Sequence, residues 1–148
     1  STTIGKLAVT YGLMAPLREF AAARAMWGTC AGMIFMAKEI FQDQPLLGVM
    51  DIAVQRNAFG RQIDSFEADL AVAGLDGGVD APFPAVFIRA PVLANVEEAA
   101  GAEVIARLAD GTAVAARQGR LLVTAFHPEL SDDDRFHRYF LRLTEAEV

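Results

Sequence analysis

The only cysteine of this chain lies in the pentapeptide Gly28-Thr29-Cys30-Ala31-Gly32, which fits the pattern G-x-C-x-G. This pattern is typical of a nucleophile elbow, a sharp turn from a strand into a helix that exposes a reactive side chain. Small residues are expected on both sides because the backbone of such a turn is crowded and strained. A helix that begins at Cys30 would also stabilise a negative charge there and so favour the thiolate. The motif therefore predicts an enzyme with a cysteine nucleophile.

Two histidines, His127 and His137, are the candidates for the base that a cysteine nucleophile needs. His127 follows an apolar segment, in the sequence Phe126-His127-Pro128-Glu129. The proline stiffens the turn, and Glu129 is placed to lie beside the imidazole and fix its tautomer. We therefore predict a triad of Cys30, His127 and Glu129. His137 lies among charged residues of the last predicted helix and is predicted to be a surface residue.

Each of these residues also has a simpler interpretation. A lone cysteine is usually an unreactive packing residue, and a histidine at the end of a strand is usually structural. For Cys30, the G-x-C-x-G frame after a predicted strand favours the catalytic role. The acidic run Asp132–Asp134 is interpreted as the charged start of a helix. A metal site is not expected, because one cysteine and two histidines form no cluster with ligand spacing.

The hydrophobic periodicity of the chain places both motifs at the ends of predicted strands. Cys30 follows a short apolar strand and precedes a helix, whereas His127 follows the last of three short strands joined by tight turns. The predicted helices cover residues 4–14, 16–23 and 31–40 and a last segment opened by 132–134. The predicted strands cover residues 25–27, 47–55, 65–72, 85–88, 103–108, 112–117 and 121–125, and residues 56–62 are predicted to form a surface loop. This order indicates an α/β fold with a mixed sheet and an added antiparallel portion.

Length and composition limit the classes of protein to which this chain can belong. Its 148 residues, of which 53% are hydrophobic, suit a single globular domain over residues 1–148. The net charge of -6 and the lack of a Lys/Arg cluster disfavour binding to nucleic acids or anionic membranes. No apolar run approaches the ~18 residues that span a bilayer, and no signal peptide is visible. A single cysteine excludes an internal disulfide and indicates a cytoplasmic protein.

Several longer segments match one protein family. They are Ser1-Thr2-Thr3, Pro16-Leu17-Arg18-Glu19-Phe20, Gly28-Thr29-Cys30-Ala31-Gly32, Ala37-Lys38-Glu39-Ile40, Arg56-Asn57-Ala58-Phe59-Gly60-Arg61-Gln62, Asp64-Ser65-Phe66-Glu67, Val86-Phe87-Ile88-Arg89-Ala90-Pro91 and Phe126-His127-Pro128-Glu129-Leu130. In these segments the chain resembles the glutaminase subunit of pyridoxal 5'-phosphate synthase, a class I glutamine amidotransferase of the triad type. The cysteine elbow and the His-Pro-Glu element are shared by class I amidotransferases in general. Segments 56–62 and 64–67 are specific to the vitamin B6 branch.

The resemblance implies a three-layer α/β fold with a mixed, mainly parallel sheet, and a glutaminase reaction. Cys30 would attack the side-chain carboxamide of L-glutamine and form a γ-glutamyl thioester with release of ammonia. His127 would take the thiol proton, protonate the departing nitrogen and later activate water, while Glu129 orients the imidazole. The backbone N–H of Ala31 would donate one hydrogen bond to the oxyanion.

The resemblance also implies which residues bind glutamine and where the ammonia goes. Ser1, Arg56 and the pair Ile88-Arg89 would contact the substrate, and either Arg56 or Arg89 could hold its α-carboxylate. The ammonia would pass to a separate synthase subunit that builds pyridoxal 5'-phosphate from a pentose phosphate and a triose phosphate. Pyridoxal 5'-phosphate is thus a product of the complex, and no cofactor is expected on this chain.

The sequence departs from the family pattern before Ser1. Family members have an N-terminal strand, helix and second strand there, ending in a Gly-Gly-Glu turn, and we expect this chain to lack that first β-α-β unit. Its absence would expose sheet edges and apolar surface. It would also remove the second oxyanion donor, and the loss of one such donor typically costs ~10²–10³ in rate.

Three other functions stay open at this point. The first is the glutaminase subunit of another class I amidotransferase, which segment 56–62 disfavours. The second is an α/β hydrolase, whose acid usually precedes its histidine, whereas Glu129 follows His127. The third is a catalytically impaired, partner-binding subunit, in view of the absent N-terminal unit.

Overall fold

The computed structural model describes residues 2–57, 59 and 64–146. The helices are α1 (Thr2–Thr10), α2 (Met14–Ala23), α3 (Ala31–Met36) and α4 (Arg135–Glu145). The strands are β1 (Met26–Thr29), β2 (Ala37–Glu39), β3 (Met50–Gln55), β4 (Ser65–Leu70), β5 (Phe83–Ile88), β6 (Val92–Val96), β7 (Ala102–Arg107), β8 (Ala113–Gln118) and β9 (Leu121–Thr124). None of the helices in these ranges is long and apolar enough to cross a membrane. Most of the predicted loop 56–62 lies outside the described residues.

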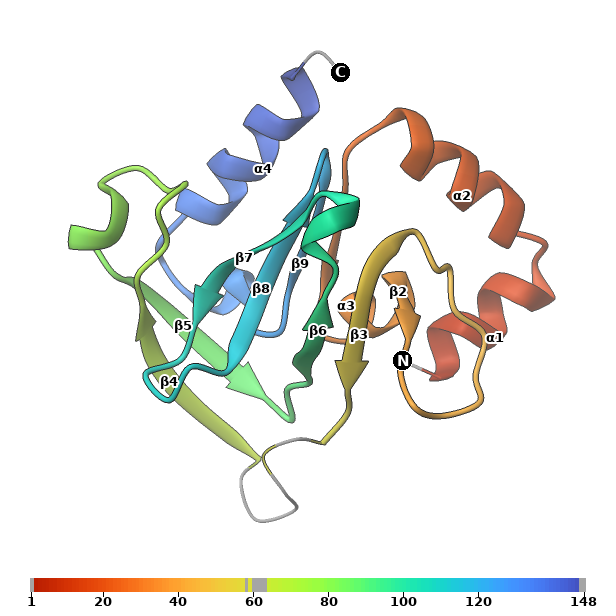
Figure 1. Cartoon of the computed structure of the whole chain (residues 1–148), viewed down its shortest axis with the longest axis horizontal. Helices are drawn as coiled ribbons and strands as arrows, with labels where there is room; N and C mark the ends of the chain where they lie inside the picture. Colours follow the sequence, from red (N-terminus) through yellow and green to blue (C-terminus); the bar gives the residue numbers. More distant parts are fainter. Residues whose placement is uncertain (1, 58, 60–63, 147–148) are drawn as a thin grey trace.

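Seven of the strands form one mixed sheet (Figure 1). Its order is β1-β9-β8-β6-β3-β2, with β7 paired to β8. β1 pairs with β9 and β2 with β3 in parallel, and the remaining pairs in the sheet are antiparallel. β4 and β5 form a separate antiparallel pair. The predicted α/β fold with a mixed sheet is confirmed, with one correction: antiparallel pairs outnumber parallel ones among the described residues, because the run β7-β8-β9 adds hairpins.

Residues of β1 contact helices on both faces of the sheet. Trp27 packs against Phe136 and Phe140 of α4, with ring centroids 6.3 and 5.4 Å apart. The next residue, Gly28, lies against α3 and Met36 instead. Successive strand residues point to opposite faces, so α4 covers one face and α3, packed with α1, covers the other (Figure 1). This is the three-layer arrangement that the resemblance implies.

A cluster of buried aromatic rings joins α4 to the strands that lead into the candidate site. Phe83, Phe87, Phe126 and Phe136 are each 0% exposed. The Phe126 ring centroid lies 5.5 Å from that of Phe87 and 5.2 Å from that of Phe136. Aromatic pairs of this kind contribute about 0.5–1.5 kcal/mol each beyond the burial of their surface. Since Phe126 directly precedes His127, the cluster fixes the backbone from which the histidine projects.

Helix α3 is shorter than predicted. It ends at Met36 rather than at residue 40, because the loop that follows β2 supplies donors for its last carbonyl groups. Leu47 N–H donates to Phe35 O at 2.8 Å, and Val49 N–H donates to Met36 O at 3.0 Å. Residues 37–39 then pair with β3 as a strand. The sequence pattern 31–40 is apolar enough for either element, and tertiary pairing decides between them.

Several other boundaries also differ from the prediction. No strand is predicted from the sequence at residues 92–96, where β6 lies, although only Asn95 of its five residues is polar. The first helix ends at Thr10, since Gly12 takes a φ of +66°, and Met14 begins α2. Asp132–Asp134 precede α4 instead of forming its first turn.

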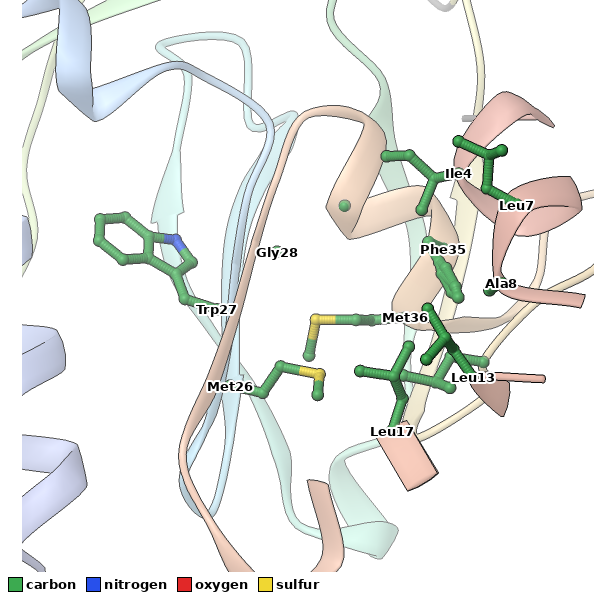
Figure 2. Close-up of a pocket in the computed structure, with 12 residues that line it drawn as sticks. Ile4, Leu7, Ala8, Leu13, Leu17, Met26, Trp27, Gly28, Phe35 and Met36 are labelled. Atoms are coloured by element: carbon green, nitrogen blue, oxygen red, sulfur yellow. The ribbon is translucent and has the colours of Figure 1, made fainter. Parts of the chain in front are cut away.

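An apolar cavity of about 340 Å³ lies beside β1, whose only paired neighbour among the described strands is β9. Figure 2 shows Met36 reaching from α3 toward β1, which carries Met26, with Leu7 and Leu17 on the side of the helices and Trp27 pointing away from the cavity.

Candidate active site

Cys30 lies in a strained turn between β1 and α3. The strand ends at Thr29 and the helix begins at Ala31, and Cys30 between them has a φ of +51° and a ψ of -103°. Residues with a Cβ rarely adopt this conformation, which costs on the order of 1–3 kcal/mol. The Cys30 N–H donates to Thr124 O at 2.8 Å and so holds the turn against β9. The local structure is the strand, tight turn and helix that a nucleophile elbow requires.

The two glycines of the motif have different surroundings. A Cβ on Gly28 would lie 2.5 Å from Gly32 O and 2.7 Å from Met36 Sδ, so only glycine fits where β1 approaches α3. A Cβ on Gly32 would meet no atom within 4 Å. Crowding therefore explains the first glycine, whereas the expectation that it also explains the second is wrong for this chain.

His127 lies at the same edge of the sheet as Cys30. β1 and β9 run in parallel with Thr29 opposite Thr124, so the residues that follow the two strands emerge side by side. The His127 N–H donates to Val86 O at 2.9 Å, which ties this turn to β5. Backbone pairing of neighbouring strands thus places two residues that are far apart in the sequence at one edge of the sheet.

Glu129 contacts the imidazole of His127 directly. Its Oε1 lies 2.6 Å from Nδ1, and the short 3₁₀ turn Pro128–Leu130 brings the carboxylate back toward the ring. With the carboxylate at Nδ1, that nitrogen donates its proton and Nε2 keeps a free lone pair. The pair therefore has the geometry of a base with its orienting acid.

Burial raises the pKa of the Cys30 thiol above its ordinary value. The Ala31 N–H bonds to the sulfur and lowers this pKa without offsetting the burial, while the negative charge of Glu129 raises it. The start of α3 does favour the thiolate through the Ala31 N–H, as the sequence predicts, but loss of solvent at the sulfur outweighs this contribution and the net shift of the pKa is upward. The thiol is protonated at neutral pH, so its reactivity requires a base.

A cavity of about 250 Å³ opens beside Cys30. Its lining residues are Cys30, Ala31, Ile34, Arg56, Asn57, Arg89 and Pro91. The predicted nucleophile, the predicted oxyanion donor and both predicted arginines thus share one cavity, although they come from three separate segments. A thiol beside two guanidinium groups suits a small substrate that carries a carboxylate.

Arg56 faces uncharged oxygens. Its Nη1 lies 3.0 Å from Gln44 Oε1, 3.2 Å from Gln42 Oε1 and 3.4 Å from Thr2 Oγ1. No carboxylate of the described residues pairs with it, so its positive charge is not offset within this part of the chain. Sequence reasoning missed both glutamines, because polar residues in a loop carry no signal of what they contact.

Arg89, in contrast, is paired with an acid. Its Nε lies 3.3 Å from Oδ1 of Asp64, and the two side chains are 76% and 73% exposed. Its φ is +45°, and its N–H donates to Asp64 O at 2.7 Å. The carbonyl of Ile88 lies 3.9 Å from the sulfur of Cys30. The backbone of the predicted pair Ile88-Arg89 therefore borders Cys30. Ser1, the remaining predicted substrate contact, lies outside the described residues.

Thr124 is a fully buried polar residue that contacts both the Cys30 turn and the segment before His127, and sequence reasoning missed it. Its carbonyl accepts the Cys30 N–H, its hydroxyl accepts the Trp27 Nε1–H at 3.1 Å, and the same hydroxyl lies 3.4 Å from Phe126 O. A threonine in an apolar strand is common, so the sequence carries no sign of this role.

Within the described ranges, no three His, Cys, Asp or Glu side chains come together to hold a metal ion. His137 is exposed, as predicted.

Comparison with known proteins places this geometry in a family. The model of the SNO glutamine amidotransferase family matches residues 1–146. The pyridoxal 5'-phosphate synthase subunit PdxT of Herpetosiphon aurantiacus is 57% identical over 97% of this chain and 75% of that protein. The subunit of the same name from Deinococcus radiodurans is 56% identical over 97% of this chain and 73% of that protein.

A solved structure supports the same assignment at the level of the fold. A crystal structure described as a glutamine amidotransferase matches with a TM-score of 0.88 and 50% identity, over 98% of this chain and 75% of that one. The resemblance that the sequence motifs indicate is therefore confirmed. This chain belongs to the SNO glutamine amidotransferase family.

Proposed function

We propose that this chain hydrolyses L-glutamine to L-glutamate and ammonia, as the glutaminase subunit of a pyridoxal 5'-phosphate synthase. The observation that carries the proposal is the strained Cys30 at the end of β1 beside the His127–Glu129 pair at the end of β9. Membership of a glutamine amidotransferase family and 52–57% identity to PdxT subunits support it.

Cys30, His127 and Glu129 have the roles of nucleophile, base and orienting acid. Because burial keeps the thiol protonated, His127 Nε2 takes its proton as the sulfur attacks the carboxamide carbon. The Ala31 N–H donates to the oxyanion that forms. The imidazolium, held by Glu129, then protonates the amide nitrogen, so that ammonia leaves and a γ-glutamyl thioester remains. A water molecule that gives its proton to His127 cleaves the thioester to glutamate and the free thiol.

Arg56 is assigned to the α-carboxylate of glutamine. Its guanidinium lines the cavity of the nucleophile and faces uncharged oxygens, so its charge is available to a substrate. Arg89 is paired with Asp64, and we therefore assign backbone contacts with the substrate to Arg89 and Ile88. Ser1 is added to these contacts on the family resemblance alone.

The ammonia passes to a synthase subunit that builds pyridoxal 5'-phosphate. The printed name of the PdxT relatives, a subunit of pyridoxal 5'-phosphate synthase, supports this partner. Direct transfer between subunits is chemically sensible, because ammonia released into water is protonated and loses its nucleophilicity. We place the reaction in the cytoplasm, where reducing conditions keep a free thiol such as Cys30 reduced.

Glutamate formation in the presence of the synthase subunit tests the proposal. Cys30→Ala should abolish hydrolysis, and His127→Asn should lower kcat by roughly 10²–10⁴. His137→Asn is the matched control, because the second histidine is exposed and packs edge-on against the Trp27 ring without lining the Cys30 cavity; its kcat should stay within about twofold of the wild type.

Each outcome decides one assignment. Activity in Cys30→Ala would refute the nucleophile, and equal losses in the two histidine variants would refute the base. If the unmodified chain formed no glutamate while it still bound the synthase subunit, the catalytically impaired, partner-binding function would replace the glutaminase.

A further inference from the structure

Gln44 connects two parts of the candidate site that are far apart in the sequence. Its Oε1 accepts hydrogen bonds from Arg56 Nη1 at 3.0 Å and from Thr2 Oγ1 at 3.2 Å. Thr2 begins α1, whereas Arg56 directly follows β3 and lines the cavity of Cys30. One amide oxygen thus holds the start of a helix and the end of a strand together at the edge of the site.

The chemistry of Arg56 fixes the orientation of this amide. A guanidinium group can only donate hydrogen bonds, so the atom 3.0 Å from Nη1 must be the oxygen of Gln44 and not its NH₂ group. Nε2 of Gln44 is buried and has no partner among the described residues. The amide oxygen of Gln44 is therefore the atom that faces both Arg56 and Thr2.

A neutral acceptor holds an arginine without cancelling its charge. Some arginines of this structure are held by carboxylates, as Arg89 is by Asp64 and Arg135 by Asp133, whereas others, such as Arg18, donate to backbone carbonyl groups. Each of those ion pairs offsets the positive charge that a ligand would otherwise meet. An amide gives a comparable hydrogen bond and leaves the full charge of Arg56 directed at the cavity.

We infer that Gln44 is a positioning residue for substrate binding: its amide oxygen fixes the Arg56 guanidinium at the cavity while leaving it free to bind the α-carboxylate of an amino acid. The inference rests on the proposed function, which supplies that carboxylate.

The single cysteine serves as the reporter for a test. 6-Diazo-5-oxo-L-norleucine carries the α-amino acid group of glutamine; Cys30 displaces its N₂, and the thiol proton ends on the new CH₂ group of the thioether. Iodoacetamide alkylates the same thiol with no amino acid group to recognise. Labelling of the chain, with the synthase subunit present, is followed by mass spectrometry at increasing reagent concentration. The half-saturating concentration of the diazo reagent reports recognition, and the iodoacetamide rate reports the thiol alone.

Gln44→Ala should raise the half-saturating concentration about tenfold and leave the iodoacetamide rate within about twofold. Gln44→Glu keeps an acceptor but sets a carboxylate against Arg56, so it should raise that concentration at least as far without lowering the Tm. Gln42→Ala is the matched control: it removes an exposed acceptor of Arg56 that has no bond to Thr2, and it should raise the value by about twofold at most.

A merely structural role predicts the opposite result for Gln44→Glu, because the new ion pair would restore the contact and the wild-type labelling. That result, or unchanged half-saturation in Gln44→Ala, would overturn the inference. Equal changes with both reagents, or an equal effect of Gln42→Ala, would overturn it too. If iodoacetamide labels the unmodified chain but the diazo reagent does not saturate, the proposed glutamine site itself is refuted, and the inference with it.

Discussion

Gly28→Ala should destabilise this protein, whereas Gly32→Ala should not, although both glycines belong to the same G-x-C-x-G motif. A Cβ at position 28 would lie 2.5 Å from Gly32 O, 2.6 Å from Gly32 C and 2.7 Å from Met36 Sδ. Ordinary contacts between such atoms lie at about 3.5–4.0 Å. The Met36 thioether can turn aside, but the two backbone atoms cannot, so α3 would have to move away from β1.

The expected magnitude follows from the kind of contact. Overpacking typically costs about 1–3 kcal/mol, and a clash with backbone belongs at the upper end, at about 3 kcal/mol. For a domain of this size each kcal/mol shifts the Tm by about 2–4 °C, so Gly28→Ala should lower the Tm by roughly 6–12 °C. Gly32→Ala places a methyl group in open space within α3, where alanine is favoured by about 0.5–1 kcal/mol, and should raise the Tm by roughly 1–4 °C.

Thermal unfolding followed by circular dichroism measures both shifts, and the iodoacetamide rate of Cys30 reports whether the elbow between β1 and α3 has moved. The close approach of strand and helix would be refuted if Gly28→Ala melted within about 2 °C of the wild type. It would equally be refuted if Gly32→Ala proved the less stable of the two.

Three further predictions concern the thiol, the start of α4 and the buried hydroxyl. Because burial raises the pKa of Cys30, its alkylation rate should reach half its plateau above pH ~8.5, and a midpoint below that contradicts the burial argument. Hydrogen bonds from Arg135 lower the pKa of Asp133, so this acid contributes stability that is present above its unfolded pKa of about 3.9 and lost as the pH falls through the folded value. Urea unfolding at neutral and acid pH should show that the free energy of unfolding falls less on acidification in Asp133→Asn than in the wild type. Thr124→Val should lower the free energy of unfolding by about 1–2 kcal/mol, and Thr124→Ser should restore most of this loss. An unchanged free energy of unfolding in Thr124→Val would show that the buried hydroxyl does not contribute.

Local steric and chemical requirements were readable from the sequence. The strained turn at Cys30 needs a strand, a small residue such as Gly28 and a helix within a few positions, and all of these are visible in one pentapeptide. His127 and Glu129 are two residues apart, so their contact depends on one turn. Short-range features of this kind do not depend on where the rest of the chain goes.

Properties that depend on contacts between distant segments could not be predicted from the sequence. The pKa of Cys30 depends on how completely neighbouring segments exclude water, and the sequence indicated only the smaller contribution from the start of α3 and not the larger effect of burial. The contacts of Gln44 with Thr2 and Arg56 join positions in different elements through loop geometry alone. The end of α3 was misplaced for the same reason, since a distant loop competes for its carbonyl groups.

The two halves of the site are therefore held by different kinds of structure. Cys30 and His127, the proposed nucleophile and base, follow β1 and β9, whose parallel backbone pairing sets where both residues emerge and supports the strain at Cys30. The groups assigned to the substrate follow β3 and β5, where Arg89 has a positive φ and Arg56 is held by side-chain hydrogen bonds. Backbone pairing resists substitution more than side-chain contacts do, since any residue supplies the same N–H and C=O. Substitutions at the ends of β3 and β5 should consequently change KM with little change in kcat, whereas those that disturb the β1–β9 pairing should lower kcat and stability together.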